Sequence, residues 1–456
     1  MKRDLRSITA WWLLALGLGL VVWDQFMGAW TYAQAADSAS ASDSLPLYLG
    51  ARAVRWGYDP TDTAVLQEMY VAADIHVTRA LFSVLYPPSM HVFLQPLAGL
   101  SYNGFLYYWR QVLMAVAVLG TAMAGSVGVH GRRLPAAMMA SVLGAFVLFP
   151  TFIEVQVALG QPNPLVAGVF GLAMGCAARG WMSMAALAAA AGAGVKLVPA
   201  IIGWPLLMGM RWRAVAVAII AGLMVLSATI VHVPLDRIVD NIQATMAFQQ
   251  TVEPHWLHDH TLGDGARFIG FLRRPSLLLI SIILVGWSAY GARLNPTRQR
   301  EVVAIGIAFL STALAADGAG VGAYYATLAI PGMAALLTWP LSTGASRWSW
   351  FTVGAAFAVF GVVDEGLIYN TPNVEVRLVS ACAAIWLGLA IRLCTLSGPW
   401  TWRARGAGGV VVASALIHAS IWTWRPPFGG HKTLKEAAPG SQTTPLQPSI
   451  APIPHD

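Results

Sequence analysis

Charged residues are scarce in this sequence. Only 11% of its 456 residues are Asp, Glu, Lys or Arg, and 57% are hydrophobic, whereas a soluble domain of average composition carries about 25% charged residues. This deficit excludes an ordinary soluble domain and indicates an integral membrane protein. The net charge of +7 does not indicate a nucleic-acid partner, because the Arg residues cluster in short turns between apolar segments, as they do in cytoplasmic loops.

The sequence also has few cysteines and no recognisable metal motif. Its three cysteines, Cys176, Cys382 and Cys394, all lie inside apolar runs, so neither a disulfide framework nor a metal-ligand spacing is present. No D-x-D pair that could hold a divalent ion occurs, and no internal repeat is evident. We therefore expect no metal and no other cofactor.

Long apolar segments are abundant. A spanning helix needs about 20 mainly apolar residues, and backbone groups in lipid must be paired within the helix. The sequence therefore predicts an all-α polytopic membrane protein with about 11–13 membrane segments. The candidate segments are 8–30, 83–100, 104–128, 134–151, 162–178, 181–210, 212–233, 276–292, 302–316, 324–339, 350–368, 377–395 and 407–424.

Two of these segments contain prolines that interrupt a helix. Adjacent prolines at 87 and 88 indicate that residues 85–93 are re-entrant rather than spanning. The sequence VKLVP (195–199) breaks the segment 181–210, which must cross the membrane twice or not at all, because Arg179 and Arg211 both mark the cytoplasmic side.

The basic residues also set the orientation. Lys2, Arg3 and Arg6 place the N-terminus in the cytoplasm, so 31–80 and 234–275 are predicted to be large extracytoplasmic loops. These two segments hold many of the acidic residues, which suggests chemistry where the extracytoplasmic face of the membrane meets water.

The two ends of the chain differ in character. The motif AQA at 33–35 leaves open a cleaved signal peptide, although we expect a retained first helix because the apolar run continues to Trp30. Residues 1–424 are predicted to form one membrane domain, and the Pro-rich tail 425–456 a disordered segment.

Five short motifs occur in order between residues 40 and 270. They are Asp43 with Tyr48 and Gly57-Tyr58-Asp59-Pro60; Tyr86-Pro87-Pro88; Leu159-Gly160-Gln161-Pro162-Asn163; Lys196-Leu197-Val198-Pro199; and His260-Thr261-Leu262 followed by Arg267. This series resembles glycosyltransferase family 87, whose members are membrane-embedded enzymes of GT-C architecture. The sequence departs from the family pattern at Thr61, where a Tyr is frequent, and at 259–261, where Asn-Gln-Ser is frequent.

The resemblance implies a sugar transferase. The donor would be a polyprenyl-phosphate sugar, most plausibly mannose, and the acceptor a lipid-linked or cell-envelope glycan outside a bacterial plasma membrane. Such a reaction needs a base for the acceptor hydroxyl and a counter-charge for the leaving phosphate. Asp43 is the predicted base, with Asp37 as a substitute; the alternative is that Asp43 is a solvated loop acid. Asp59 is predicted to cap a turn before Pro60.

Cations are predicted to hold the phosphate. Lys196 interrupts an apolar run, so it either faces a protein interior or extends to the interface. His258, His260 and Arg267 are further candidates; the alternatives for their stretch are a polar loop and a metal site.

Four uncharged residues complete the predicted substrate contacts. Gln161 and Asn163 either hydrogen-bond sugar hydroxyls or form a turn between helices. Tyr48 and Tyr86 belong to the matched motifs.

Two other functions remain open from the sequence alone. A transporter would line a path at the bilayer midplane with ionisable residues, and only Lys196 and Glu154 come near that. A non-catalytic assembly protein that keeps the fold would account for the substituted motif at 259–261.

Overall fold

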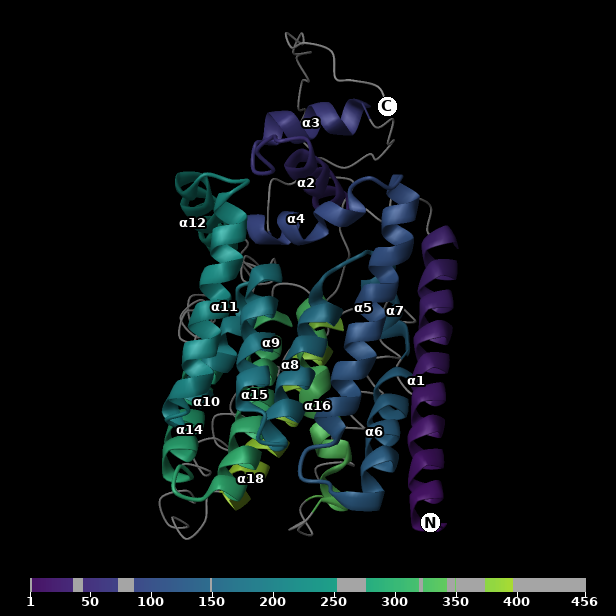
Figure 1. Cartoon of the computed structure of the whole chain (residues 1–456), viewed down its shortest axis with the longest axis vertical. Coiled ribbons are helices and arrows are strands. Elements are labelled where there is room, and N and C mark those ends of the chain that lie inside the picture. The colour runs from purple at the N-terminus through teal and green to yellow at the C-terminus, as the bar shows by residue number, and fades with distance from the viewer. Residues whose placement is uncertain are drawn as a thin grey trace, which may run out of the picture.

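The computed structural model describes residues 2–35, 44–72, 86–147, 150–251, 276–319, 323–342, 349 and 374–396. These residues form a bundle of helices with a smaller group of helices at one end (Figure 1). No strand occurs among them. The all-α fold predicted from the composition is therefore confirmed.

The long helices run roughly parallel to the long axis of the molecule (Figure 1). We call the end at which the N-terminus lies the basal end. The helices of the bundle are α1 (Lys2–Ala35), α5 (Tyr102–Gly125), α6 (Leu134–Val142), α7 (Pro150–Ala158), α8 (Asn163–Ala178), α9 (Met182–Val195), α10 (Gly203–Met208), α11 (Trp212–Ile230), α14 (Ser276–Gly291), α15 (Pro296–Ala319), α16 (Ile330–Leu337) and α18 (Val374–Leu396).

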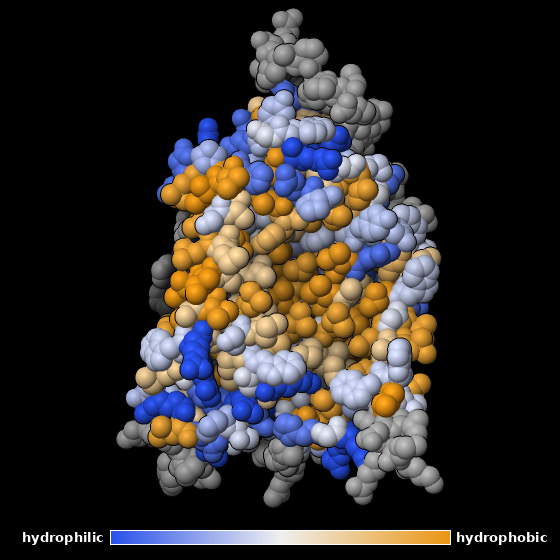
Figure 2. All heavy atoms as spheres, viewed as in Figure 1, coloured by the Kyte–Doolittle hydropathy of each residue, from blue (hydrophilic) through white to orange (hydrophobic). Residues whose placement is uncertain are grey.

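The opposite end carries an apical layer, which we define as helices α2 (Leu45–Arg55), α3 (Thr63–Ala72), α4 (Pro88–Leu94) and α12 (Leu235–Thr251) (Figure 1). Helices α2, α3 and α12 come from segments that the sequence suggested were loops, whereas α4 comes from the predicted span 83–100. Hydrophobic residues gather on the middle of the molecule, between hydrophilic residues near its two ends (Figure 2). That distribution is the one expected of a protein that crosses a bilayer.

Among the residues that the structure describes, three helices are long and apolar enough to cross a membrane: Ile8–Thr31, Trp212–Ile230 and Pro296–Ala316. The first two face outward, because only 33% and 11% of their most apolar stretches are buried inside the protein, whereas that of the third is 83% buried. The helix α15 therefore forms the centre of the bundle, and the exposed apolar side chains of α1 and α11 face lipid.

The predicted span 83–100 does not cross the bundle. Its described part consists of α4 and a single 3-10 turn, Gln95–Leu97. A helix of seven residues is only about 10 Å long, so it cannot span the membrane. Pro88 stands at the first helical position of α4, where a missing N–H is tolerated. The proline pair thus starts a short helix of the apical layer, so the span predicted at 83–100 is wrong, and a re-entrant path for 85–93 stays a prediction.

The segment 181–210 forms a hairpin. Helix α9 ends at Val195, and the chain returns through the 3-10 helix η5 (Val198–Ile202) and α10. Both ends of the hairpin contact consecutive residues at the start of α15: Gln299 donates to the Gly209 carbonyl, and Arg300 lies against Gly180. The two ends are therefore at the same side of the bundle. This confirms the predicted break at VKLVP and places Lys196 at the tip of the hairpin.

Helices α5 and α8 are in backbone contact. A methyl group added at Gly120 would overlap the backbone of Gly168, and one added at Gly171 would overlap the backbone of Gly120. Small residues let membrane helices approach this closely. The contact fixes α8 against α5 along most of its length, which matters below because both helices contribute to the candidate site.

A buried arginine closes the bundle at its basal end. Arg392 of α18 is 2% exposed and donates hydrogen bonds to the carbonyls of Val127 and Ala335. Its guanidinium also lies 5.6 Å from the ring centroid of Trp339. This side chain joins the turn after α5, the end of α16 and the last described helix.

Candidate functional site

The tip of the 181–210 hairpin presents a lysine to the neighbouring helices. Lys196 follows the last residue of α9 with an extended backbone (φ −155°, ψ 134°), and Pro199 prevents the helix from continuing. Its Nζ donates to Asn163 Oδ1 at 3.0 Å and lies 4.4 Å from the ring centroid of Tyr325. Within the part of the chain that the structure describes, no carboxylate lies within ion-pair distance of this ammonium group.

The Tyr86-Pro87-Pro88 motif packs against the same tip. Ser89, the residue after the proline pair, donates its hydroxyl to the Gly194 carbonyl at 2.6 Å. Gly194 is two residues before Lys196, so the start of α4 covers the end of α9. Tyr86 is 8% exposed. The second and fourth predicted motifs are therefore adjacent in space.

The Leu159-Gly160-Gln161-Pro162-Asn163 motif forms the turn between α7 and α8. Gly160 has a positive φ of +68°, its N–H donates to the Val157 carbonyl, and the Gln161 N–H donates to the Gln156 carbonyl. This is the hydrogen-bond pattern of a Schellman helix end, which favours glycine at the left-handed position. Asn163 then begins α8 and is fully buried, and its amide oxygen accepts the hydrogen bond from Lys196.

The opening motif lies against this turn. A methyl group added at Gly160 would lie 2.6 Å from Ser44 Cβ, and Ser44 is fully buried. The Ser44 and Tyr102 hydroxyls are 3.0 Å apart and hydrogen-bonded. Asp43 itself lies outside the described residues, but the residue bonded to it contacts the turn that leads to Asn163. The described motifs thus converge on one apical region.

Tyr48 is embedded in the protein. It is 2% exposed; its hydroxyl donates to the Leu100 carbonyl at 2.9 Å and accepts from Arg52 Nη1 at 2.9 Å. Arg52 also lies 4.3 Å from the ring centroid of Trp56. In this structure the predicted substrate contact Tyr48 holds α2 against the start of α5.

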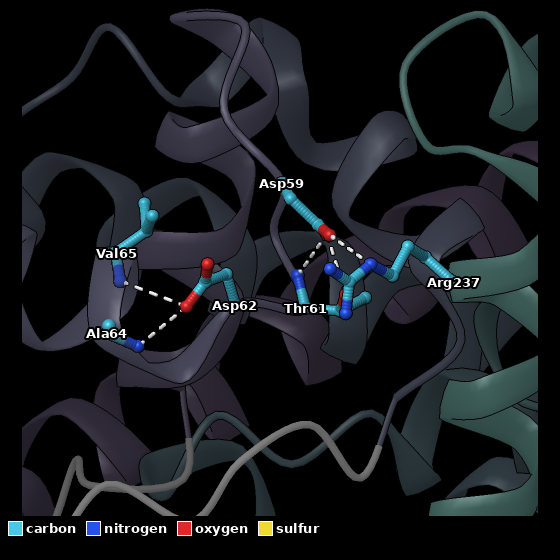
Figure 3. Close-up of polar contacts among 6 residues, drawn as sticks. All are labelled: Asp59, Thr61, Asp62, Ala64, Val65 and Arg237. Atoms are coloured by element: carbon cyan, nitrogen blue, oxygen red, sulfur yellow. Dashed lines mark hydrogen bonds and ion pairs between the residues drawn. The ribbon is translucent and has the colours of Figure 1, made fainter.

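Asp59 caps a turn, as the sequence predicts. Its Oδ1 accepts hydrogen bonds from the Thr61 N–H at 2.8 Å and the Thr61 hydroxyl at 2.6 Å. Its other oxygen lies 3.8 Å from Arg237 Nε of α12 (Figure 3). Asp59 therefore joins two parts of the apical layer.

Four predicted site residues lie outside the part of the chain that the structure describes: Asp43, His258, His260 and Arg267. Their roles stay predictions. Gln161 is 8% exposed and lies in the turn described above. In the described ranges, no group of three or more His, Cys, Asp or Glu side chains could hold a metal ion.

Three residues of this region are not among the predicted site residues. Tyr325 lies in η8 (Ala323–Ala329), and no local pattern links it to Lys196. Trp109 donates its indole N–H to the Gly160 carbonyl at 2.9 Å, and Arg110 Nη2 donates to the Ala158 carbonyl at 2.6 Å. Arg110 stands inside an apolar run, as Lys196 does, and that signal could have identified it.

The fold and this region together define an α-helical membrane protein with a cation held at the apical end of its bundle. The sequence profile of glycosyltransferase family 87 matches residues 84–316, about half of the chain. The chain therefore belongs to glycosyltransferase family 87, and it is a membrane glycosyltransferase. The match includes the turn at 159–163 and Lys196 and begins after the opening motif. No curated protein and no solved structure matches the chain.

Proposed function

We propose that this glycosyltransferase moves a sugar, mannose, from a polyprenyl-phosphate donor to a lipid-linked or cell-envelope glycan. The reaction takes place at the apical layer, on the outer face of a bacterial plasma membrane. Asp43 removes the proton from the acceptor hydroxyl, whose oxygen attacks the anomeric carbon. The bond to the donor phosphate breaks with inversion, and the polyprenyl phosphate leaves.

The observation that carries this proposal is the environment of Lys196. A cation removed from water is costly unless an opposite charge compensates it, yet the described contacts of Lys196 are a neutral amide and an aromatic ring. The side chain is only partly buried, so a ligand can reach it. A phosphate group supplies the missing negative charge.

The position of the tip agrees with a reaction at the apical layer. The start of α4 in the apical layer contacts this tip, because Ser89 donates to the Gly194 carbonyl. Lys196 therefore lies beside the apical layer, on the side of the bundle where we propose that the phosphate of the donor is bound. His258, His260 and Arg267 are the proposed additional phosphate ligands, and Gln161 and Tyr86 contribute contacts to the substrates.

The proposal is tested with purified protein in liposomes that contain polyprenyl-phosphate mannose and an extract of cell-envelope lipids. Lys196→Met should lower turnover roughly 100-fold, the size of effect seen when one charge-stabilising donor is removed, whereas Lys196→Arg should retain more activity. Arg213→Met is the matched control, because Arg213 is exposed at the start of α11. Equal turnover of Lys196→Met and wild type would remove Lys196 from the mechanism.

Asp43 has its own test. Asp43→Asn should abolish transfer while leaving the protein folded in the membrane; wild-type turnover in this variant would exclude Asp43 as the base. EDTA should leave turnover unchanged, because cations rather than a metal hold the phosphate in this proposal. The acceptor is identified by deleting the gene and finding, by mass spectrometry, which envelope lipid lacks a sugar.

A transport function makes a different prediction. A transporter would move a lipid or solute across the liposome membrane without forming a new glycosidic bond. Transport by the wild-type protein with no sugar transfer from any polyprenyl-phosphate sugar would overturn the proposal.

A further inference from the structure

Two neighbouring residues of α5 hold the turn that carries Asn163. The Schellman end of α7 pairs the carbonyls of Gln156 and Val157 and leaves the next carbonyls to find other donors. Arg110 donates to the Ala158 carbonyl and Trp109 to the Gly160 carbonyl. Both side chains are 3% exposed.

Arg110 is a buried cation without a carboxylate partner in the described ranges. Its described contacts are the Ala158 carbonyl at 2.6 Å and the ring of Trp30, whose centroid is 5.7 Å away. Its Nε is buried and has no hydrogen-bond partner. A positive charge at a helix C-terminus interacts favourably with the helix dipole, so Arg110 caps α7 electrostatically as well as by hydrogen bonding.

The capped turn continues directly into the residue that positions the cation of the site. Asn163 begins α8 three residues after Gly160, and its Oδ1 accepts the hydrogen bond from Lys196. Further along, α8 is fixed by its backbone contact with α5 at Gly120. The apical end of α8 therefore takes its position from Trp109 and Arg110.

We infer that Arg110, together with Trp109, is a positioning residue for the transfer reaction: it fixes the 158–163 turn so that Asn163 holds the ammonium group of Lys196 at the donor phosphate. The inference rests on the proposed function, since it names what sets the position of the proposed phosphate ligand. Neither residue contacts substrate in this scheme. Loss of Arg110 weakens donor binding because the hydrogen-bond acceptor of Lys196 shifts.

The test uses two conservative variants and one matched control. Arg110→Lys keeps the positive charge but presents a single ammonium in place of the forked guanidinium, and Trp109→Phe removes the indole N–H donor together with part of the ring volume. The control is Arg179→Lys, because Arg179 donates to the Gly175 carbonyl at 3.0 Å and so caps the basal end of α8. All three variants lose a helix-capping contact, but only the first two act on the candidate site.

Binding of undecaprenyl phosphate to full-length protein in detergent is measured by ligand-dependent thermal shift, alongside KM and kcat for transfer. Arg110→Lys and Trp109→Phe should raise both the donor KM and the dissociation constant of undecaprenyl phosphate about tenfold. Arg179→Lys should lower the melting temperature by a similar amount to these two variants, but should leave the donor KM and the dissociation constant within twofold of wild type. Unchanged donor affinity in folded Arg110→Lys and Trp109→Phe overturns the inference.

A double-mutant cycle shows whether Arg110 acts through Asn163. In an Asn163→Ala background, where Lys196 has already lost its acceptor, Arg110→Lys should change donor affinity less than twofold. A further tenfold loss there overturns the inference, because Arg110 would then act by another route. If wild-type protein neither binds undecaprenyl phosphate nor transfers sugar, the proposed function itself fails, a result distinct from either of these.

Discussion

Gly160 is the position at which one methyl group should most clearly report the assembly of the site. Its φ is +68°, a region that costs a residue with a side chain about 1–2 kcal/mol. The added methyl of Gly160→Ala would also lie 2.6 Å from Ser44 Cβ and 3.0 Å from Ser44 Oγ, and overpacking of this kind costs about 1–3 kcal/mol. We expect the free energy of unfolding to fall by about 2–5 kcal/mol in total.

Gly57 provides the matched control. Its φ is +79°, and a methyl group added there meets no atom within 4 Å, so Gly57→Ala measures the backbone penalty alone, about 1–2 kcal/mol. Unfolding is followed by tryptophan fluorescence in mixed micelles with increasing SDS. The difference between the two variants is the contribution of the contact with Ser44.

The same contact can be removed from the other side. In a Ser44→Gly background the atoms that the methyl group would meet are absent, so the cost of Gly160→Ala should fall to that of Gly57→Ala. Equal costs for Gly160→Ala and Gly57→Ala in the otherwise unmodified protein would show that Ser44 does not contact the turn. The opening motif would then lie apart from Asn163 and Lys196, and the convergence of motifs described above would be wrong.

Three further outcomes are expected. Burial lowers the pKa of His91 in α4 from 6.5 to about 4, so the unfolded chain gains a proton at a higher pH than the folded one. About 3 kcal/mol of stability should therefore be lost as the pH falls from 6.5 to 4. His91→Leu should remove this pH dependence of the free energy of unfolding, measured by unfolding at a series of pH values. Gly120→Ala should destabilise the protein strongly, because its methyl group overlaps the backbone of α8, whereas Gly222→Ala places a methyl group in open space and should not. Equal melting temperatures of these two variants would contradict the close contact between α5 and α8. Arg237→Met should cost less than 1 kcal/mol, because Arg237 is 58% exposed in its pair with Asp59, and a larger, salt-independent loss would contradict a surface ion pair.

The sequence was sufficient for the helical class and for the interruptions of the bundle. The low charge content indicated spanning helices because an unpaired backbone is too costly in lipid. The prolines at 87–88 and 199 predicted interruptions of the segments 83–100 and 181–210, because proline removes a backbone donor and clashes with the preceding turn. These are local effects, and local effects can be read from neighbouring residues.

The contacts of the site could not be read in the same way. Lys196 was singled out, but its partners Asn163 and Tyr325 are far from it in the sequence, and their positions depend on how helices pack. Residues 45–55 and 63–72 appeared to be parts of a loop, yet they form α2 and α3. Short helices of this kind owe their stability to tertiary packing more than to intrinsic propensity, so composition alone did not reveal them.

The hydrogen bonds of Arg392 have a consequence for biosynthesis. The Val127 carbonyl that this side chain binds is 265 residues earlier in the chain, so it is made and inserted long before α18 leaves the ribosome. Until then the turn after α5 and the end of α16 lack the donor that joins them. The basal end of the bundle is therefore closed only once α18 has been made and inserted, and a chain that stops short of α18 lacks this closure.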